Sequence, residues 1–215
     1  MLRIHVRNER PEDRRAVEEL TKKAFWNVNV PGCDEHYLVH VLREHADFVP
    51  ALDLVAEADG RLIGNLMAAK GRLLDEAGES REVLSFGPLS VHPAYQRRGV
   101  GKRLLAEGFR RAEALGFDAI VIFGNPDNYT ARGFESCLKH RIYVGDHIYP
   151  AAMLVKELKP GALRDGVERQ YVESAAYHYL PADAEAFDRD FEPMEKGWAP
   201  TQEMFYILRH STLRE

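Results

Sequence analysis

The chain has 215 residues, of which 45% are hydrophobic and 29% are charged, and its formal net charge is −5. This composition is ordinary for a soluble globular protein with a sizeable core, and the net negative charge argues against a protein that coats nucleic acid. No apolar run approaches the ~20 residues that a membrane-spanning helix requires, so the sequence predicts no membrane partner.

Hydrophobic periodicity and turn signals predict the order of the elements. Alternating apolar residues indicate strands, recurrence every three to four residues indicates helices, and Asp59-Gly60 is a strong hairpin signal. The expected elements are a strand at 2–7, helices at 11–25 and 35–44, strands at 52–58, 62–70 and 83–91, a helix at 100–115, and strands at 119–123, 141–144 and 152–158. This order predicts a mixed α/β fold with helices flanking a central sheet.

The pattern changes after Leu158. Lys159-Pro160-Gly161 has the composition of a linker, so we divide the chain into a domain at 1–158 and a C-terminal extension at 159–215. The extension predicts a strand at 171–179 and a short helix at 181–191, and it is too apolar for a disordered tail. We expect it to pack on the core or on a partner subunit; the alternative is that it closes one wall of a substrate site.

The cysteines and histidines argue against a disulfide framework and against a metal site. Two cysteines, Cys33 and Cys137, are too few for a disulfide framework, which suits a reducing compartment and predicts a cytoplasmic location. His36 and His40 stand four residues apart on an expected helix, with Cys33 and His45 nearby, a spacing that can hold a metal. The segment lacks the H-E-x-x-H pattern, so we expect partly exposed histidines and no metal site.

The most informative segment joins the strand that ends at His92 to the helix that begins at Val100. It contains Gln96-Arg97-Arg98-Gly99-Val100-Gly101, followed by Lys102 and Arg103. Glycines at a helix start let an anion approach the unpaired backbone N–H groups, where the helix dipole is positive. The basic side chains add to this positive charge. The segment therefore predicts a phosphate-binding cradle.

Two other phosphate-binding patterns do not fit this segment. A Walker A loop needs Ser or Thr after Gly-Lys and an earlier glycine, whereas Arg103 follows Lys102 and Gln96 takes the glycine position. A dinucleotide fingerprint needs a small residue where Leu104 stands. A nucleotide-phosphate enzyme is therefore disfavoured, and a glycine-rich helix start without a ligand is the plainer alternative.

A second pattern follows the buried strand expected at 119–123. Gly124-Asn125-Pro126 ends the strand, and Tyr129 stands four residues before Gly133-Phe134. The two patterns resemble those of the GNAT superfamily of N-acetyltransferases, namely its Q/R-x-x-G-x-G/A loop and its Y-x-x-x-G-F element. The resemblance covers roughly residues 1–158 and implies the GNAT fold, a mixed central sheet flanked by helices.

The resemblance implies acetyl-CoA as the cosubstrate, with its pyrophosphate in the glycine loop. Carried over residue by residue, the family's contacts fall on Leu89, Ser90, Val91, Arg97, Arg98, Gly99, Val100, Gly101, Lys102, Asn128 and Tyr129. Asn128 departs from the family, which often has an aromatic residue there. Gly87-Pro88 fits a local break in sheet pairing just before the contact strand, because proline cannot donate to the ladder.

The same resemblance implies transfer of an acetyl group to a primary amine by direct attack in a ternary complex. Tyr129 is the candidate general acid for the departing thiolate, and packing beside the cosubstrate is its simpler role. Glu82 is the candidate general base; Ser85 and His92 are alternatives, and deprotonation through water needs no single base.

The acceptor stays open between a small-molecule amine and a peptide amine, and the family needs no metal. Trp26, in the linker between the first two helices, either borders the acceptor or anchors the core. A homodimer would give the extension a surface to cover. The alternative function, from another class, is a catalytically silent module that binds acetyl-CoA as a sensor or scaffold.

Overall fold

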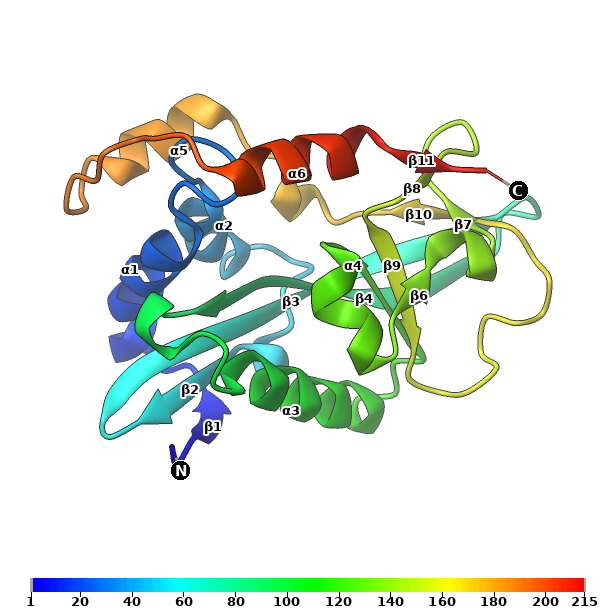
Figure 1. The fold of residues 1–215 in the computed structure, drawn as a ribbon. Coiled ribbons are helices and arrows are strands. Elements are labelled where there is room, and N and C mark those ends of the chain that lie inside the picture. Colours follow the sequence, from blue (N-terminus) through cyan, green and yellow to red (C-terminus); the bar gives the residue numbers. More distant parts are fainter. Residues whose placement is uncertain (1, 215) are drawn as a thin grey trace.

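The computed structural model describes residues 2–214, and a nine-stranded mixed sheet lies at its centre (Figure 1). Its strands are β1 (His5–Asn8), β2 (Leu54–Ala58), β3 (Arg61–Asp75), β4 (Ser80–Val91), β5 (Ala119–Phe123), β6 (Glu135–Ser136), β7 (Ile142–Tyr143), β9 (Met153–Glu157) and β10 (Arg169–Val172). The main path runs β1-β2-β3-β4-β5-β9-β6, and β10 pairs with both β3 and β7. A separate pair joins β8 (Tyr149–Pro150) to β11 (Thr212–Leu213).

Helices connect and cover these strands. The α-helices are α1 (Arg14–Phe25), α2 (Glu35–Leu42), α3 (Val100–Ala114), α4 (Pro126–Tyr129), α5 (Pro181–Asp188) and α6 (Pro200–His210). The short 3-10 helices are η1 (Pro11–Asp13), η2 (Pro50–Leu52), η3 (Pro93–Tyr95), η4 (Thr130–Arg132), η5 (Cys137–His140) and η6 (Ala175–Tyr177). No helix among residues 2–214 is long and apolar enough to cross a membrane.

The two faces of the sheet are covered by different helices. Figure 1 shows α3 along one face, and α1, α2 and η6 along the other. Leu104 of α3 packs with Leu84 and Phe86 of β4 in one buried cluster. On the opposite face, Val17 of α1 and Ala176 of η6 belong to a second cluster. The sheet therefore separates the cluster beneath α3 from the clusters on its opposite face, and alternate residues of each strand enter one side or the other.

The mixed α/β architecture expected from the sequence is the one observed, with several corrections to the elements. The third strand continues beyond residue 70 to Asp75, since its outer half pairs with both β4 and β10. The strand expected at 171–179 is wrong: β10 ends at Val172, and Ser174 then caps η6 by accepting from the Ala176 N–H. Helix α6 had no counterpart among the expected elements.

Strands β4 and β5 separate soon after they meet. They run parallel and pair at Leu84 opposite Ile120, while β4 continues to Val91 in antiparallel pairing with β3. The β3–β4 register shifts between Leu66 and Ala68, opposite Gly87-Pro88. This bulge lies at the position where the Gly-Pro pair predicted a break in pairing, and beyond it one backbone edge of β4 is not laddered to β5.

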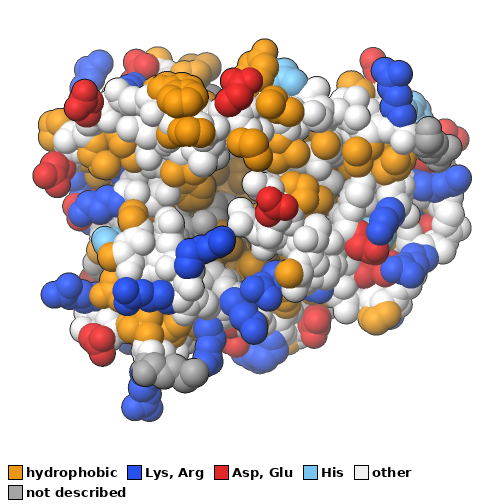
Figure 2. Space-filling model, in the orientation of Figure 1, with side chains coloured by type: hydrophobic (Ala, Val, Ile, Leu, Met, Phe, Trp, Pro, Cys, Tyr) orange, Lys and Arg blue, Asp and Glu red, His pale blue; other side chains and the backbone are white. Residues whose placement is uncertain are grey.

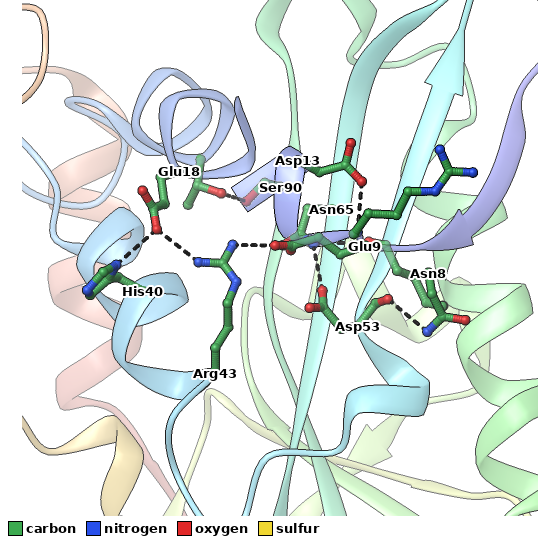
Figure 3. Close-up of polar contacts among 12 residues, drawn as sticks. Asn8, Glu9, Asp13, Glu18, His40, Arg43, Asp53, Asn65 and Ser90 are labelled. Atoms are coloured by element: carbon green, nitrogen blue, oxygen red, sulfur yellow. Dashed lines mark hydrogen bonds and ion pairs between the residues drawn. The ribbon is translucent and has the colours of Figure 1, made fainter. Parts of the chain in front are cut away.

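A buried polar network ties the first two helices to the sheet (Figure 3). Arg43, which follows α2, bridges Glu9 at 2.8 Å and Glu18 at 2.9 Å, and all three side chains are almost fully buried. On the sheet side, the Asn65 amide donates to Asp53 Oδ1 at 3.3 Å. Such a network resists the removal of any one member because its partner would be left unpaired and buried.

Candidate active site

The separated ends of β4 and β5 carry two sets of side chains, one on each face of the sheet. On the α3 face, Leu89, Val91 and Tyr129 pack against the cluster that contains α3. On the other face, Ser85 shares the side of Val83, because residues two apart in a strand point the same way. Figure 2 shows a hollow in the middle of this view, with hydrophobic side chains around it and Lys and Arg below it.

The loop before α3 presents a row of free backbone donors on the α3 face. Within residues 2–214, no intramolecular partner is found for the N–H groups from Arg97 to Lys102; the next N–H, that of Arg103, bonds to the Gly99 carbonyl at 3.1 Å. The side chains of Arg97, Arg98, Lys102 and Arg103 are exposed around this row. Unpaired donors, a helix N-terminus and basic side chains together make an anion site.

The two glycines of the loop serve different purposes. Gly99 is the N-cap of α3 and has φ +86°, a left-handed conformation that side chains rarely adopt. Gly101 lies inside the first turn, where a Cβ would meet Val91 at 3.7 Å and Leu89 at 3.8 Å, which is ordinary contact. Gly99 is thus required by the backbone, whereas the missing side chain at Gly101 keeps the approach to the donors open.

The three contact residues expected on β4 do not present their backbones alike. The His92 N–H bonds to Ile63 on β3, and the Gln96 side chain reaches the Val91 carbonyl at 3.2 Å from the other side. Backbone direction alternates along a strand, so Leu89 and Val91 turn their N–H groups away from β3, and Ser90 faces β3. The Ser90 hydroxyl bonds instead to Thr21 of α1 at 2.9 Å.

Tyr129 stands at the end of α4, just beyond β5. Its ring packs edge-on against Phe134, with centroids 5.5 Å apart, and a Cβ at Gly124 would stand 2.6 Å from the ring. Burial raises the pKa of its hydroxyl, so the group keeps its proton at neutral pH. The neighbouring Asn128 is exposed, and its backbone N–H bonds to Asn125 within the turn.

The C-terminal extension supplies the side chains on the opposite face. The Tyr177 hydroxyl donates to the Gly87 carbonyl of β4 at 3.2 Å. Tyr171 is buried, and the centroid of its ring lies 6.2 Å from that of Phe123. Burial raises the pKa of the Tyr171 hydroxyl, and the nearby Ser85 side chain opposes this rise. The extension therefore packs directly on the strand that carries the candidate site.

Two of the candidate general bases from the sequence, Glu82 and His92, already have partners within the protein. The Glu82 carboxylate is half exposed and pairs with Lys70 at 3.1 Å, and alternation puts it on the face of Leu84, opposite to that of Ser85. The His92 ring accepts from the Ala94 N–H at 3.2 Å and so caps η3. Partial burial, followed by the charge of Lys23, lowers the His92 pKa.

The linker between α1 and α2 is held by the extension. The Trp26 indole donates to the Glu195 carbonyl at 2.8 Å, while Asn29 lines a pocket beside α6. Asn29 also donates to Glu35 at 3.2 Å, and burial raises the pKa of that carboxyl to about 7. Trp26 is thus an anchor for the extension, and Glu35 is a perturbed acid in the linker region.

The histidines near the linker differ from expectation in one respect. His36 is completely buried rather than partly exposed, because Phe187 and Phe191 enclose its ring and Asp188 lies 3.0 Å from its Nε2. His40 has a half-exposed side chain. Among the residues that the structure describes, no group of three or more His, Cys, Asp or Glu is arranged to hold a metal ion.

The sequence does not predict that Tyr171 and Tyr177 reach β4. Both fall in the strand expected at 171–179, and nothing local indicates that β10 adds to β3. The available signal was Ser174, whose hydroxyl favours a turn and would have ended the strand before residue 175. The partner surface on β4 could not be inferred from spacing.

Comparison with known proteins gives the following similarities. A family model described as the acetyltransferase (GNAT) family matches residues 16–135. The uncharacterized N-acetyltransferase YjhQ of Escherichia coli K12 is 32% identical over 120 residues, which are 56% of this chain and 62% of YjhQ. The uncharacterized N-acetyltransferase YhbS of the same strain is 32% identical over 136 residues, 63% of this chain and 75% of YhbS.

Solved structures resemble this one over most of its length. The crystal structure of E. coli YhbS in complex with CoA has a TM-score of 0.71 and 27% identity, and the match covers 84% of this chain and 94% of that one. A GNAT acetyltransferase from Brucella melitensis in complex with acetyl-CoA has a TM-score of 0.64 and 26% identity, with coverages of 81% and 98%. With the family model matching more than half of its residues, this chain belongs to the GNAT acetyltransferase family.

Proposed function

We propose that this protein is an N-acetyltransferase that transfers an acetyl group from acetyl-CoA to a primary amine by direct attack, with both substrates bound together. The observation that carries the proposal is the row of unpaired N–H groups from Arg97 to Lys102 beside the free edge of β4. Family membership supports it, as do the relatives that bind CoA or acetyl-CoA.

The residues present fit acetyl-CoA. The pyrophosphate would lie on the free donors at the start of α3, with Arg97, Arg98 and Lys102 neutralising its charge. The Leu89 and Val91 N–H groups, turned away from β3, would bind the pantetheine and the thioester, and Tyr129 and Asn128 would border the sulfur end. Bound acetyl-CoA supplies the activated acetyl group.

The transfer needs few protein groups. The neutral amine nitrogen forms a bond to the acyl carbon while the carbon–sulfur bond breaks, and the nitrogen then releases one proton to solvent to give the amide. A free N–H of β4 would stabilise the charge that develops on the carbonyl oxygen. The Tyr129 hydroxyl carries a proton at neutral pH, as tyrosine ordinarily does; it can give this proton to the departing thiolate and regain one from solvent.

The cradle is tested by adding a negative charge to it. Gly101→Glu fits sterically, because a Cβ meets only ordinary contacts there, but its carboxylate would repel the pyrophosphate. We expect the CoA affinity to fall by about tenfold or more, since hydrogen bonds to charged groups contribute roughly 1.5–3 kcal/mol. Ala106→Glu, exposed one turn further along α3, makes the same charge change and should leave calorimetric CoA binding unaltered. Equal affinities in both variants would remove the cradle assignment.

Activity is tested separately, by release of free thiol from acetyl-CoA in the presence of a panel of primary amines. The alternative function, a silent acetyl-CoA-binding module, is favoured by Asn128, where the family often has an aromatic residue, and by the lack of an obvious general base in the sequence. It predicts CoA binding without thiol release above the spontaneous rate for every amine. Turnover with any one amine would exclude it.

A further inference from the structure

Tyr171 crosses strand β3 to reach β4. Strand β10 pairs with the outer half of β3, with Tyr171 opposite Leu73. The Tyr171 ring lies over Gly71, where a Cβ would stand 2.8 Å from the ring and 3.1 Å from the hydroxyl. A side chain at Gly71 would therefore displace the phenol, and glycine opens the path by which the extension reaches the neighbouring strand.

The Tyr171 hydroxyl is a buried polar group without a good partner. The residue is 3% exposed, and within residues 2–214 its hydroxyl has no partner at full hydrogen-bond geometry; Ser85, which interacts with both the Tyr171 and the Tyr177 phenols, makes at most a weak hydrogen bond to it. The Tyr177 hydroxyl, by contrast, donates a hydrogen bond to the Gly87 carbonyl. Buried polar groups are normally satisfied, so an unsatisfied phenol beside Ser85 indicates a ligand contact.

Glu173 belongs to the same cluster. It stands two residues after Tyr171, immediately past the end of β10. Its negative charge helps to raise the pKa of both the Tyr171 and the Tyr177 phenols, which puts the carboxylate near each of them. Its side chain is a quarter exposed, and its one recorded cationic neighbour, His178, lies 3.9 Å away and is itself mostly exposed.

We propose that Glu173, together with Tyr171 and Ser85, forms the acceptor-amine site on the face of the sheet opposite the acetyl-CoA cradle, and that Glu173 is the general base. This inference rests on the proposed function and names a residue from the extension for it. The carboxylate binds the ammonium form of the amine. It then accepts one proton from nitrogen, which frees the lone pair for attack, and the proton leaves through the solvent-exposed side of Glu173.

The other candidate carboxylates lie outside the cluster of Tyr171 and Ser85. Glu82 is neutralised by Lys70 and lies on the α3 face. Glu35 bonds to Asn29 in the linker, and its recorded neighbours lie in the linker and at Tyr179. Burial raises the pKa of Glu173 above its usual value, with His178 opposing the shift, which brings it closer to that of a working base.

The test uses CoA derivatives that carry the amine themselves. S-(2-aminoethyl)-CoA places an ammonium just beyond the sulfur, and S-propyl-CoA is its uncharged isostere. In calorimetry the wild type should prefer the aminoethyl compound by about tenfold or more, the usual strength of a charge-assisted hydrogen bond. Glu173→Gln should abolish this preference and leave the S-propyl-CoA affinity unchanged. Glu185→Gln, on the exposed side of α5, is the matched control and should keep it.

Each remaining outcome decides the inference. Tyr171→Phe, which keeps the ring, should weaken the preference in a variant that retains the packing. No preference in the wild type, a preference that survives Glu173→Gln, or one lost instead in Glu35→Gln or Glu82→Gln would overturn the assignment. A loss of S-propyl-CoA binding in Glu173→Gln would also overturn it, because the role would then be structural.

Turnover separates this inference from the proposed function. With any amine that the wild type acetylates, Glu173→Gln should lower turnover by about 10²–10⁴, the range for general base catalysis. Unchanged turnover would remove the proton-accepting role. If the wild type prefers the ammonium compound but acetylates no amine, the amine-binding site is supported and the proposed transferase function is rejected.

Discussion

Single residues in this protein hold protons for reasons that only the fold supplies. Asp53 follows η2 and looks like a loop residue, yet burial, and then the nearby Glu9, raise its pKa to about 8, while Arg43 acts in the opposite direction. Tyr129 could be identified from its motif, but not the burial that raises the pKa of its hydroxyl. Sequence thus indicates which residues can titrate, and the packing decides when they do.

Asp53 predicts a dependence of stability on pH. Its pKa is raised from 3.8 to about 8 on folding, so the folded chain keeps a proton that the unfolded chain loses. The free energy of unfolding should therefore fall as pH rises from about 4 to about 8, by as much as ~1.4 kcal/mol per pH unit for one group. Asp53→Asn stays neutral and should be more stable than the wild type at pH 9, by about 1 kcal/mol or more.

Urea unfolding at pH 5 and at pH 9 measures this difference. The side-chain amide that Asp53→Asn introduces can still accept from Asn65, so the local hydrogen bond survives the change. Asp59→Asn, on the exposed hairpin turn, is the matched control and should show no such trend. A stability difference between Asp53→Asn and the wild type that is the same at both pH values would contradict the assigned protonation.

Tyr129 predicts an effect on chemistry rather than on binding. Tyr129→Phe keeps the contact with Phe134 and removes only the proton donor. Turnover with any accepted amine should fall by about 10²–10⁴, while the calorimetric affinity for CoA changes little. Near-wild-type turnover, measured where the chemical step limits the rate, would return Tyr129 to a packing role.

At the scale of elements, the sequence predicts turns and helix starts well, because these depend on the backbone conformation of a few neighbouring residues. The Asp59-Gly60 hairpin and the helix start at Gly99 follow from backbone conformation, and Asp59 and Gly60 do have positive φ. The length of β3, the two-residue β7 and the turn at η6 depend on partners distant in sequence, which alternation cannot reveal.

The contact between α3 and the sheet gives a prediction that opposes helix propensity. A Cβ on Gly108 would stand 2.8 Å from the Phe86 ring and 2.9 Å from Leu66. Gly108→Ala gains about 1 kcal/mol of propensity but overpacks a rigid contact, at a cost of roughly 1–3 kcal/mol or more. We expect net destabilisation in thermal unfolding. Ala106→Gly, on the exposed side of the same helix, is the control and should lose about 1 kcal/mol of stability through helix propensity alone. If Gly108→Ala were more stable than the wild type, the close contact would be refuted.

At the scale of the whole molecule, the family model covers residues 16–135, and the C-terminal extension at 159–215 is held by docking onto the sheet and the first two helices. β10 completes the outer half of β3, and Ala176 enters the core beneath α1 and α2. The Lys22 ammonium, buried at 3% exposure, pairs with Asp188 of α5 at 2.6 Å. The extension is therefore joined to the core by backbone pairing, apolar packing and charge at once.

Two truncations should consequently behave differently. A chain ending at Lys159 loses β10 and η6, which uncovers the β3 edge at 72–75 and the apolar residues beneath Ala176. An unpaired edge of this kind promotes association, so we expect aggregation or a lower melting temperature. A chain ending at Glu195 loses only α6 and β11, where Met204 is 62% and Tyr206 59% exposed. This longer chain should stay monodisperse in size-exclusion chromatography and bind CoA like the full chain. If the two truncated chains behaved alike, β10 and η6 would not be needed to support the core.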